Sequence, residues 1–176
     1  KREITNINFF FQALLKLSKF DTNTIKFTNK EEKVVDILST AIQNVSVLCD
    51  LKDIEIVVTG NIENTINCDI RWQVEAISNV LKNSVEYSNN SSKIQIVCNK
   101  NKVYSEIRII DNGKGIDKED IKHIFERFYK GKNSSRDSVG IGLALAKTII
   151  EQNNDTISVE SEIGKGTSII LTIPKA

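Results

Sequence analysis

Residues 69–88, DIRWQVEAISNVLKNSVEYS, carry the strongest helical pattern in the chain. Apolar side chains recur within it at intervals of three and four residues, the spacing of one helix face; they are Val74, Ile77, Val80, Leu81 and Val85. Asn79 and Asn83 stand four residues apart, so both project from one side of this helix. Because apolar residues surround the two asparagines, we expect that side to meet a core or a pocket.

Downstream of this helix, apolar periodicity and turn residues predict further strands and helices. The predicted ranges are strands 94–98 and 103–110, helices 118–128 and 143–152, and a hairpin of strands 156–161 and 168–173. The segment 129–139 is polar, and we expect it to be a mobile loop.

Upstream, the pattern predicts a helix, a short strand, a second helix and another strand, over residues 9–17, 25–27, 28–50 and 54–59. The second helix is predicted to begin at Thr28 as N-cap, with Glu31 three residues further on. The first helix is aromatic-rich and needs a surface to pack on, either its own domain or the partner of a longer dimerising helix. Together these elements predict an α/β sandwich, with helices covering one face of a mixed, mostly antiparallel sheet.

Composition sets the class of protein. The 176 residues suffice for one domain with a core, and 40% hydrophobic with 27% charged residues are ordinary for a globular protein. The net charge of +1 gives no broad reason to expect nucleic acid or a membrane surface as partner. Cys49, Cys68 and Cys98 are isolated, which favours small buried thiols, and the single histidine, His123, excludes a His-rich metal site.

Two motifs lie on or after predicted regular elements. The carbonyl oxygens of Asn79 and Asn83 suit Mg²⁺, although both amides can instead bond to backbone. The second motif, Asp111-Asn112-Gly113-Lys114-Gly115-Ile116, follows a strand. Its glycines permit positive φ and close approach of a flat ligand, and its Asp can accept a hydrogen bond from an exocyclic amine such as that of adenine. An ordinary Asp-Asn-Gly turn is the alternative.

Two glycine-rich segments follow. Gly140-Ile141-Gly142-Leu143 leads into a helix, whose exposed N–H groups and dipole favour phosphate; a flexible hinge before a helix is the alternative. The segment is neither a Walker A motif nor a dinucleotide-binding fingerprint. Gly164-Lys165-Gly166-Thr167 is plausible hairpin chemistry, and Thr167 can add a hydroxyl to an adenine pocket.

The order and spacing of these motifs resemble the nucleotide-binding boxes of bacterial two-component sensor histidine kinases. The resembling segments are Asn79-x3-Asn83, Asp111-x-Gly113-x-Gly115, Phe125-Glu126-Arg127-Phe128-Tyr129, Gly140-x-Gly142-Leu143 and Gly164-x-Gly166-Thr167, similar to the N, G1, F, G2 and G3 boxes. That family belongs to the GHKL superfamily, with gyrase, heat-shock chaperone and mismatch-repair ATPases. The resemblance covers residues from about 28 to 174 and implies a two-layer Bergerat α/β sandwich with a lid from about Tyr129 to Val139.

The resemblance implies a role for each motif residue. Asn83 resembles the Mg²⁺ ligand, and Asn79 lies beside the phosphates of ATP. Asp111 resembles the residue that binds the adenine amino group. The remaining residues implied to contact the nucleotide are Tyr87 at the helix end, Gly113, Gly115 and Ile116 around adenine, Lys130 at phosphate, Gly140, Gly142 and Leu143 at phosphate and ribose, and Thr167 on the adenine side.

The implied activity is that of a protein-histidine kinase, in which the γ-phosphoryl group of ATP passes to a histidine on a dimerisation domain absent from this chain. His123, directly before the F box, occupies a packing position and is not the expected acceptor. Residues 14–21 resemble the end of the second dimerisation helix that precedes such a domain. We expect residues 1–22 to be a truncated piece of that helix and residues 23–176 to be the catalytic domain. Implied partners are the dimerisation domain, a response regulator and a second copy of the full-length protein, with this domain cytoplasmic and the parent membrane-anchored.

Two rival functions stay open on the sequence. A hydrolytic ATPase, or a serine-directed anti-sigma kinase, is the first; a hydrolytic member needs a carboxylate four residues before its metal-binding asparagine. If Asn83 binds the metal, that position holds Asn79, which is not a carboxylate. If Asn79 binds the metal, the position holds Glu75, but Asn83 is then left without a role. The second rival is a nucleotide-sensing module without catalysis.

Overall fold

A five-stranded sheet and a layer of helices form the body of the protein. The structure is a computed structural model that describes residues 2–22, 24–131 and 140–175, with side chains from residue 11 onward. The strand order is β2-β4-β5-β7-β6, and only β2 and β4 run parallel. The strands are β2 (Glu55–Gly60), β4 (Lys93–Lys100), β5 (Tyr104–Asp111), β6 (Thr156–Glu162) and β7 (Gly166–Pro174). The expected mixed, mostly antiparallel sheet is therefore confirmed.

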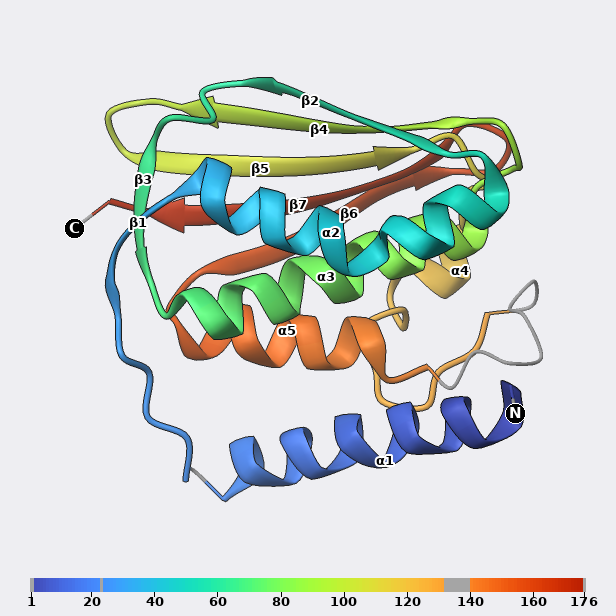
Figure 1. Cartoon of the computed structure of the whole chain (residues 1–176), viewed down its shortest axis with the longest axis horizontal. Coiled ribbons are helices and arrows are strands. Elements are labelled where there is room, and N and C mark those ends of the chain that lie inside the picture. Colours follow the sequence, from blue (N-terminus) through green and yellow to red (C-terminus); the bar gives the residue numbers. More distant parts are fainter. Residues whose placement is uncertain (1, 23, 132–139, 176) are drawn as a thin grey trace.

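Helices cover one face of this sheet, as Figure 1 shows. The covering layer consists of α2 (Val34–Lys52), α3 (Ile70–Tyr87) and α5 (Gly142–Gln152). The first helix, α1 (Arg2–Asp21), lies beyond α5 on the side away from the sheet (Figure 1). A single turn, α4 (Lys118–Ile121), follows the β5 turn. The predicted α/β sandwich is thus the observed architecture.

The core lies between the sheet and these helices. Inward-facing strand residues alternate with outward-facing ones, and buried members include Ile94, Ile96, Ile107, Ile109, Ile169 and Leu171. In β5 this alternation ends with Asp111, which is therefore the last inward-facing residue of a central strand. The predicted apolar stripe of α3 faces the same core, with Ile77, Val80 and Leu81 fully buried. Among the described helices, only α2 is long and apolar enough to cross a membrane. Core helices meet the same test of length and composition, and six side chains of α2 are buried.

The N-terminal part of α2 differs from the prediction. The helix begins at Val34, and Thr28 does not cap it. Residues 30–33 instead form β1 (Lys30–Lys33), which pairs antiparallel with β3 (Thr65–Cys68), a strand that the sequence analysis missed. The first N–H groups of α2 donate to the carbonyls of Asn64 and Ile62 at 2.8 and 2.9 Å, so a tertiary contact replaces the expected side-chain cap.

Two further predicted elements are corrected. Residues 25–27 form no strand; Phe27 packs in a ring cluster with Phe20 and Trp72. The helix expected over 118–128 ends at Ile121. Beyond it the chain turns tightly, and Phe128 adopts a left-handed conformation with φ 65°, which no helix continues through. The expected loop 129–139 falls in part on residues 132–139, outside the described residues.

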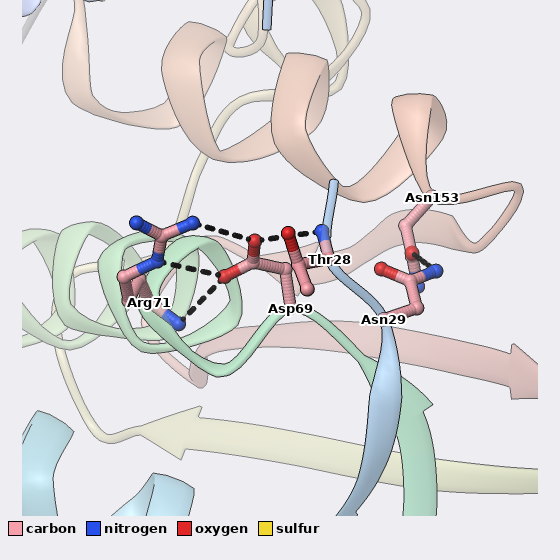
Figure 2. A network of polar contacts seen from close by, with 5 residues as sticks. All are labelled: Thr28, Asn29, Asp69, Arg71 and Asn153. Carbon is pink, nitrogen blue, oxygen red and sulfur yellow. Dashed lines mark hydrogen bonds and ion pairs between the residues drawn. The ribbon is translucent and has the colours of Figure 1, made fainter. Parts of the chain in front are cut away.

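The segment after α1 is attached to the body by two adjacent residues (Figure 2). Thr28 N donates to Asp69 Oδ2 at 3.0 Å, and the same carboxylate caps α3 and pairs with the Arg71 guanidinium. Asn29 Nδ2 donates to Asn153 Oδ1 at 2.7 Å, just beyond the end of α5. The chain leaving α1 is therefore held to both α3 and the α5 terminus before it enters β1.

Asp155 is a buried carboxylate next to this attachment. It accepts a hydrogen bond from Asn153 Nδ2 at 2.8 Å, and burial raises its pKa to about 6. The pKa of Asp155 in the folded protein thus lies above the usual value for aspartate. The folded state is favoured fully below about pH 4, where the carboxyl is neutral, and this stability is lost as the pH rises through 6.

We predict that Asp155→Asn raises the free energy of unfolding at pH 7.5 by up to about 3 kcal/mol, since it removes the cost of burying a charge. Near pH 4 the variant and the parent should have equal stability. Urea unfolding at both pH values measures the difference, with the exposed Asp50→Asn as control. If the free energy of unfolding of the variant minus that of the parent were smaller at pH 7.5 than at pH 4, the proposed cost of the buried charge would be wrong.

Candidate functional site

The site residues gather along α3, which connects two clusters. Asn79 lies near the middle of the helix and Tyr87 is its last residue. Eight residues of α-helix separate them by about 12 Å, the scale of a nucleotide with its phosphates. One cluster surrounds Asp111 near Tyr87, and the other surrounds Gly142 near Asn79.

Asp111 is the centre of the first cluster, and only 3% of it is exposed. Its Oδ1 accepts from Gly113 N at 2.9 Å and from Thr167 N at 3.3 Å, and the Ser84 hydroxyl also hydrogen-bonds to the carboxylate. Burial raises the pKa of Asp111, while these hydrogen bonds oppose the rise. No lysine or arginine among the described residues forms an ion pair with it. The group is thus a buried acceptor held in place by neutral donors.

Glycines allow the backbone to close around this carboxylate. A Cβ at Gly113 would lie 2.5 Å from the Tyr87 carbonyl oxygen, so the turn after β5 packs directly on the end of α3. Gly166 has φ +92°, and a Cβ there would lie 2.0 Å from the Asp111 carbonyl oxygen. Only glycine fits either position without displacing backbone.

A hydroxyl pair joins the β5 turn to the hairpin. Ser161 Oγ accepts from Ile116 N at 2.9 Å, donates to the Gly166 carbonyl at 2.8 Å and lies 2.9 Å from Thr167 Oγ1. Gly115, with φ +73°, passes so close to Glu162 that a Cβ would meet its carbonyl oxygen at 2.0 Å. Asp111 therefore lies in one cluster with Gly113, Gly115, Ile116 and Thr167, an arrangement that the family resemblance implied.

The second cluster lies at the N-terminus of α5. Gly142 is the first residue of the helix, and a Cβ there would be 3.6 Å from Asn79 Oδ1. Asn79 Nδ2 donates to the Glu75 carbonyl at 3.0 Å, which leaves its Oδ1 on the side of Gly142. The N-cap residue Ile141 makes no side-chain cap, and the first turn of α5 carries no acidic residue. The positive end of the helix dipole at this terminus favours negative charge beside Asn79.

Gly140 ties the F-box segment to this helix start. Phe128 N donates to the Gly140 carbonyl at 2.8 Å, and a Cβ at Gly140 would lie 2.3 Å from the Tyr129 carbonyl oxygen. The exposed Lys130 directly follows this contact, and Leu143 is half-buried against the core. The Tyr129 hydroxyl donates to Asp120 Oδ1 at 2.6 Å, a hydrogen bond that raises the pKa of Tyr129 to about 12.

Asn83 and Glu75 differ in their surroundings. Asn83 is half-buried one turn after Asn79. The Glu75 carboxylate pairs with the Lys16 ammonium of α1 at 2.7 Å, so its charge is already partnered.

Sequence reasoning missed two residues and misjudged a third. Ser84 and Ser161 both hold the first cluster together. Ser84 was detectable, because it is a polar residue at a core position of the α3 stripe. His123 was expected in a packing position; its ring lies 5.3 Å from that of Tyr129, yet the residue is exposed and pairs with Glu126 at 2.7 Å.

Comparison with known proteins identifies a family. Residues 68–176 match the model of the histidine kinase-, DNA gyrase B- and HSP90-like ATPases, which is more than half of the chain. Sensor histidine kinase YxdK of Bacillus subtilis is 30% identical over 96% of this chain and 53% of its own length. Sensor histidine kinase YvrG of the same organism is 36% identical over 61% of this chain and 19% of its own length. The chain thus spans about half or less of these relatives.

Solved structures share the fold. The histidine kinase AdeS of Acinetobacter baumannii superposes with a TM-score of 0.79 at 19% identity, covering 97% of this chain and 79% of its own. Full-length ShkA in complex with AMPPNP gives a TM-score of 0.79 at 18% identity, covering 92% of this chain and 34% of its own.

Two glycine substitutions should separate the stability of the site from its binding capacity. Gly113→Ala should lower the free energy of unfolding by about 1–3 kcal/mol, because the added methyl meets the Tyr87 carbonyl and Asp111. Gly142→Ala should leave stability unchanged or slightly higher, since alanine favours the helix, but should weaken binding of an ATP analogue by covering Asn79.

Thermal unfolding and calorimetric titration of both variants measure these effects. A Gly142→Ala protein that binds the analogue as tightly as the parent would show that Asn79 and the α5 N-terminus are not part of the site.

Proposed function

Because the chain belongs to the family of histidine kinase-, DNA gyrase B- and HSP90-like ATPases, we propose that residues 23–176 are the ATP-binding catalytic domain of a sensor histidine kinase. Residues 1–22 are proposed to be the end of its dimerisation helix. The observation that carries the proposal is the buried Asp111 carboxylate, held by neutral donors and without an ion-pair partner among the described residues. Such an acceptor suits a neutral N–H donor such as the adenine amino group.

The two clusters divide the nucleotide between them. Gly113, Gly115, Ile116 and Thr167 shape the adenine end around Asp111, with Tyr87 at the end of α3 flanking the nucleotide. Asn79, Gly140, Gly142 and Leu143 lie at the phosphate and ribose end. The uncapped N-terminus of α5 supports this orientation, because its N–H groups and dipole favour negative charge. Lys130 follows Tyr129, whose carbonyl packs on Gly140, and supplies a positive charge at the same end.

Mg²⁺ is proposed to bind at Asn83. Among the described residues, no three His, Cys, Asp or Glu side chains cluster closely enough to hold a metal ion, so the ATP phosphates must provide ligands. One neutral asparagine with phosphates and water is a donor set that Mg²⁺ accepts. When bound, the ion neutralises phosphate charge during transfer.

The proposed reaction transfers the γ-phosphoryl group to a histidine of a dimerisation domain. The bond from the γ-phosphorus to the β–γ bridging oxygen breaks, a bond to an imidazole nitrogen forms, and ADP leaves. This domain's residues hold the nucleotide and orient it, and they supply no nucleophile. Further proposed partners are a response regulator, which later takes the phosphoryl group, and a second copy of the full-length protein. The domain is proposed to be cytoplasmic in a membrane-anchored parent.

ATP hydrolysis with Glu75 as base is the rival function. The ion pair between Glu75 and Lys16 argues against it, because the pair directs the Glu75 carboxylate to α1.

Mixing this chain with a separate dimerisation domain that carries the phosphoacceptor histidine tests the kinase proposal. ATP labelled at the γ-phosphate should yield acid-labile phosphate on that domain. Asn83→Ala should lower the transfer rate by about a hundredfold through loss of charge neutralisation, whereas Glu75→Ala should retain it.

The exposed Asn89→Ala is the matched control and should behave as the parent. Loss of ATP turnover in Glu75→Ala with full activity in Asn83→Ala would establish the rival assignment. Absence of acid-labile phosphate from the parent chain would overturn the kinase proposal.

A further inference from the structure

Lys52, the last residue of α2, lies against the end of α3. Its Nζ donates to the carbonyl oxygens of Val85, Glu86 and Ser88 at 2.9, 2.6 and 3.0 Å. A lysine ammonium has three N–H donors, so these three bonds use its full capacity. The last carbonyls of a helix lack partners within the helix, and a cation also complements the negative end of the helix dipole. Lys52 therefore completes the C-terminus of α3 from a neighbouring helix.

The carbonyl between these acceptors belongs to the site. Tyr87 lies between Glu86 and Ser88, and its carbonyl oxygen is the atom on which Gly113 packs. Gly113 N in turn donates to Asp111 Oδ1 at 2.9 Å. The Lys52 ammonium thus bonds to the carbonyls on both sides of the Tyr87 carbonyl, on which the turn after Asp111 packs.

Lys52 also holds the segment that follows α3. Its own carbonyl accepts from Ser91 N at 2.8 Å, so the main chain and the side chain of one residue restrain residues 85–91. The next residue, Asp53, ends α2 in a left-handed conformation with φ 54°, and its N–H donates to the Asp50 carbonyl. The end of α2 is therefore itself fixed, and it can serve as an anchor for α3.

We propose that Lys52 is a positioning residue for nucleotide binding. It acts through the α3 terminus and has no contact with ATP. By fixing the Tyr87 carbonyl against Gly113, it sets the placement of the Asp111 carboxylate relative to Asn83 on α3. The part of this inference that concerns ATP rests on the proposed function; the part that concerns the Asp111 turn rests on the hydrogen bonds alone.

The first test needs no nucleotide. Amide hydrogen exchange in Lys52→Met, which keeps the apolar stem and removes the ammonium, should be about tenfold faster at Gly113 than in the parent, because several charge-assisted bonds are lost. Exchange at Val80, in the middle of α3, should not change. Lys52→Arg, which retains N–H donors, should restore protection at Gly113. Lys93→Met, which removes an exposed lysine paired with Glu55 near the same loop, is the matched control and should leave Gly113 unchanged.

The second test measures binding of an ATP analogue to the same variants, at a temperature where all are folded. Lys52→Met should bind about tenfold more weakly, with Lys52→Arg and Lys93→Met close to the parent. Unchanged exchange at Gly113, or equal acceleration at Gly113 and Val80, would overturn the positioning role, because the second pattern indicates general destabilisation. If the parent chain bound no nucleotide, the proposed function would fail while the exchange data still decided the role of Lys52.

Discussion

The Asp111 carboxylate is the constraint on which the arrangement of the site depends. A charged group this deeply buried requires donors at fixed positions, and Gly113 N, Thr167 N and the Ser84 hydroxyl supply them from three different elements. Those donors reach the carboxylate only because the β5 turn, the β6–β7 hairpin and α3 meet at one point. The close backbone contacts at Gly113, Gly115 and Gly166 follow from that meeting. The buried acceptor that binds adenine in our account is thus also what fixes the local fold around it.

The same sheet and helix layer also set the distance between the cluster around Asp111 and the cluster at the N-terminus of α5. Since α3 carries both Asn79 and the Tyr87 carbonyl, the two clusters cannot move independently without bending the helix. α1 pairs with residues near the second cluster at two points. Lys16 pairs with Glu75, one turn before Asn79, and Asp21 forms a bidentate pair with Arg127 of the F-box segment at 2.6 and 2.7 Å. The helix proposed to lead to the dimerisation domain is therefore paired with α3 and with the F-box segment, the two elements next to the second cluster.

The sequence predicted most of the fold because its strongest signals are local. The α3 stripe, the β4–β5 pair and the β6–β7 hairpin each carry their own periodicity and turn residues, and all are present. The errors occur where tertiary contacts override local preference. Lys30–Lys33 has a polar sequence yet forms a strand that pairs with β3. Thr28 and Glu31 match the pattern of a helix N-cap, but the helix begins only at Val34. The family resemblance named the motif residues. The structure brings Gly113 and Thr167 to Asp111 and brings Gly142 to Asn79. Lys52 and Ser161 had no sequence signal, because their roles depend on contacts between distant elements.

The central claim is that Asp111 binds the adenine amino group, and a comparison of ATP with inosine triphosphate tests it most directly. Inosine carries a carbonyl oxygen where adenine carries the amine, so it places an acceptor opposite a buried acceptor. Calorimetric titration in the presence of Mg²⁺ should show ATP binding at least about a hundredfold more tightly. In Asp111→Asn the preference should largely disappear, because the asparagine amide offers a donor as well as an acceptor. Equal affinity of the parent chain for the two nucleotides would contradict the account.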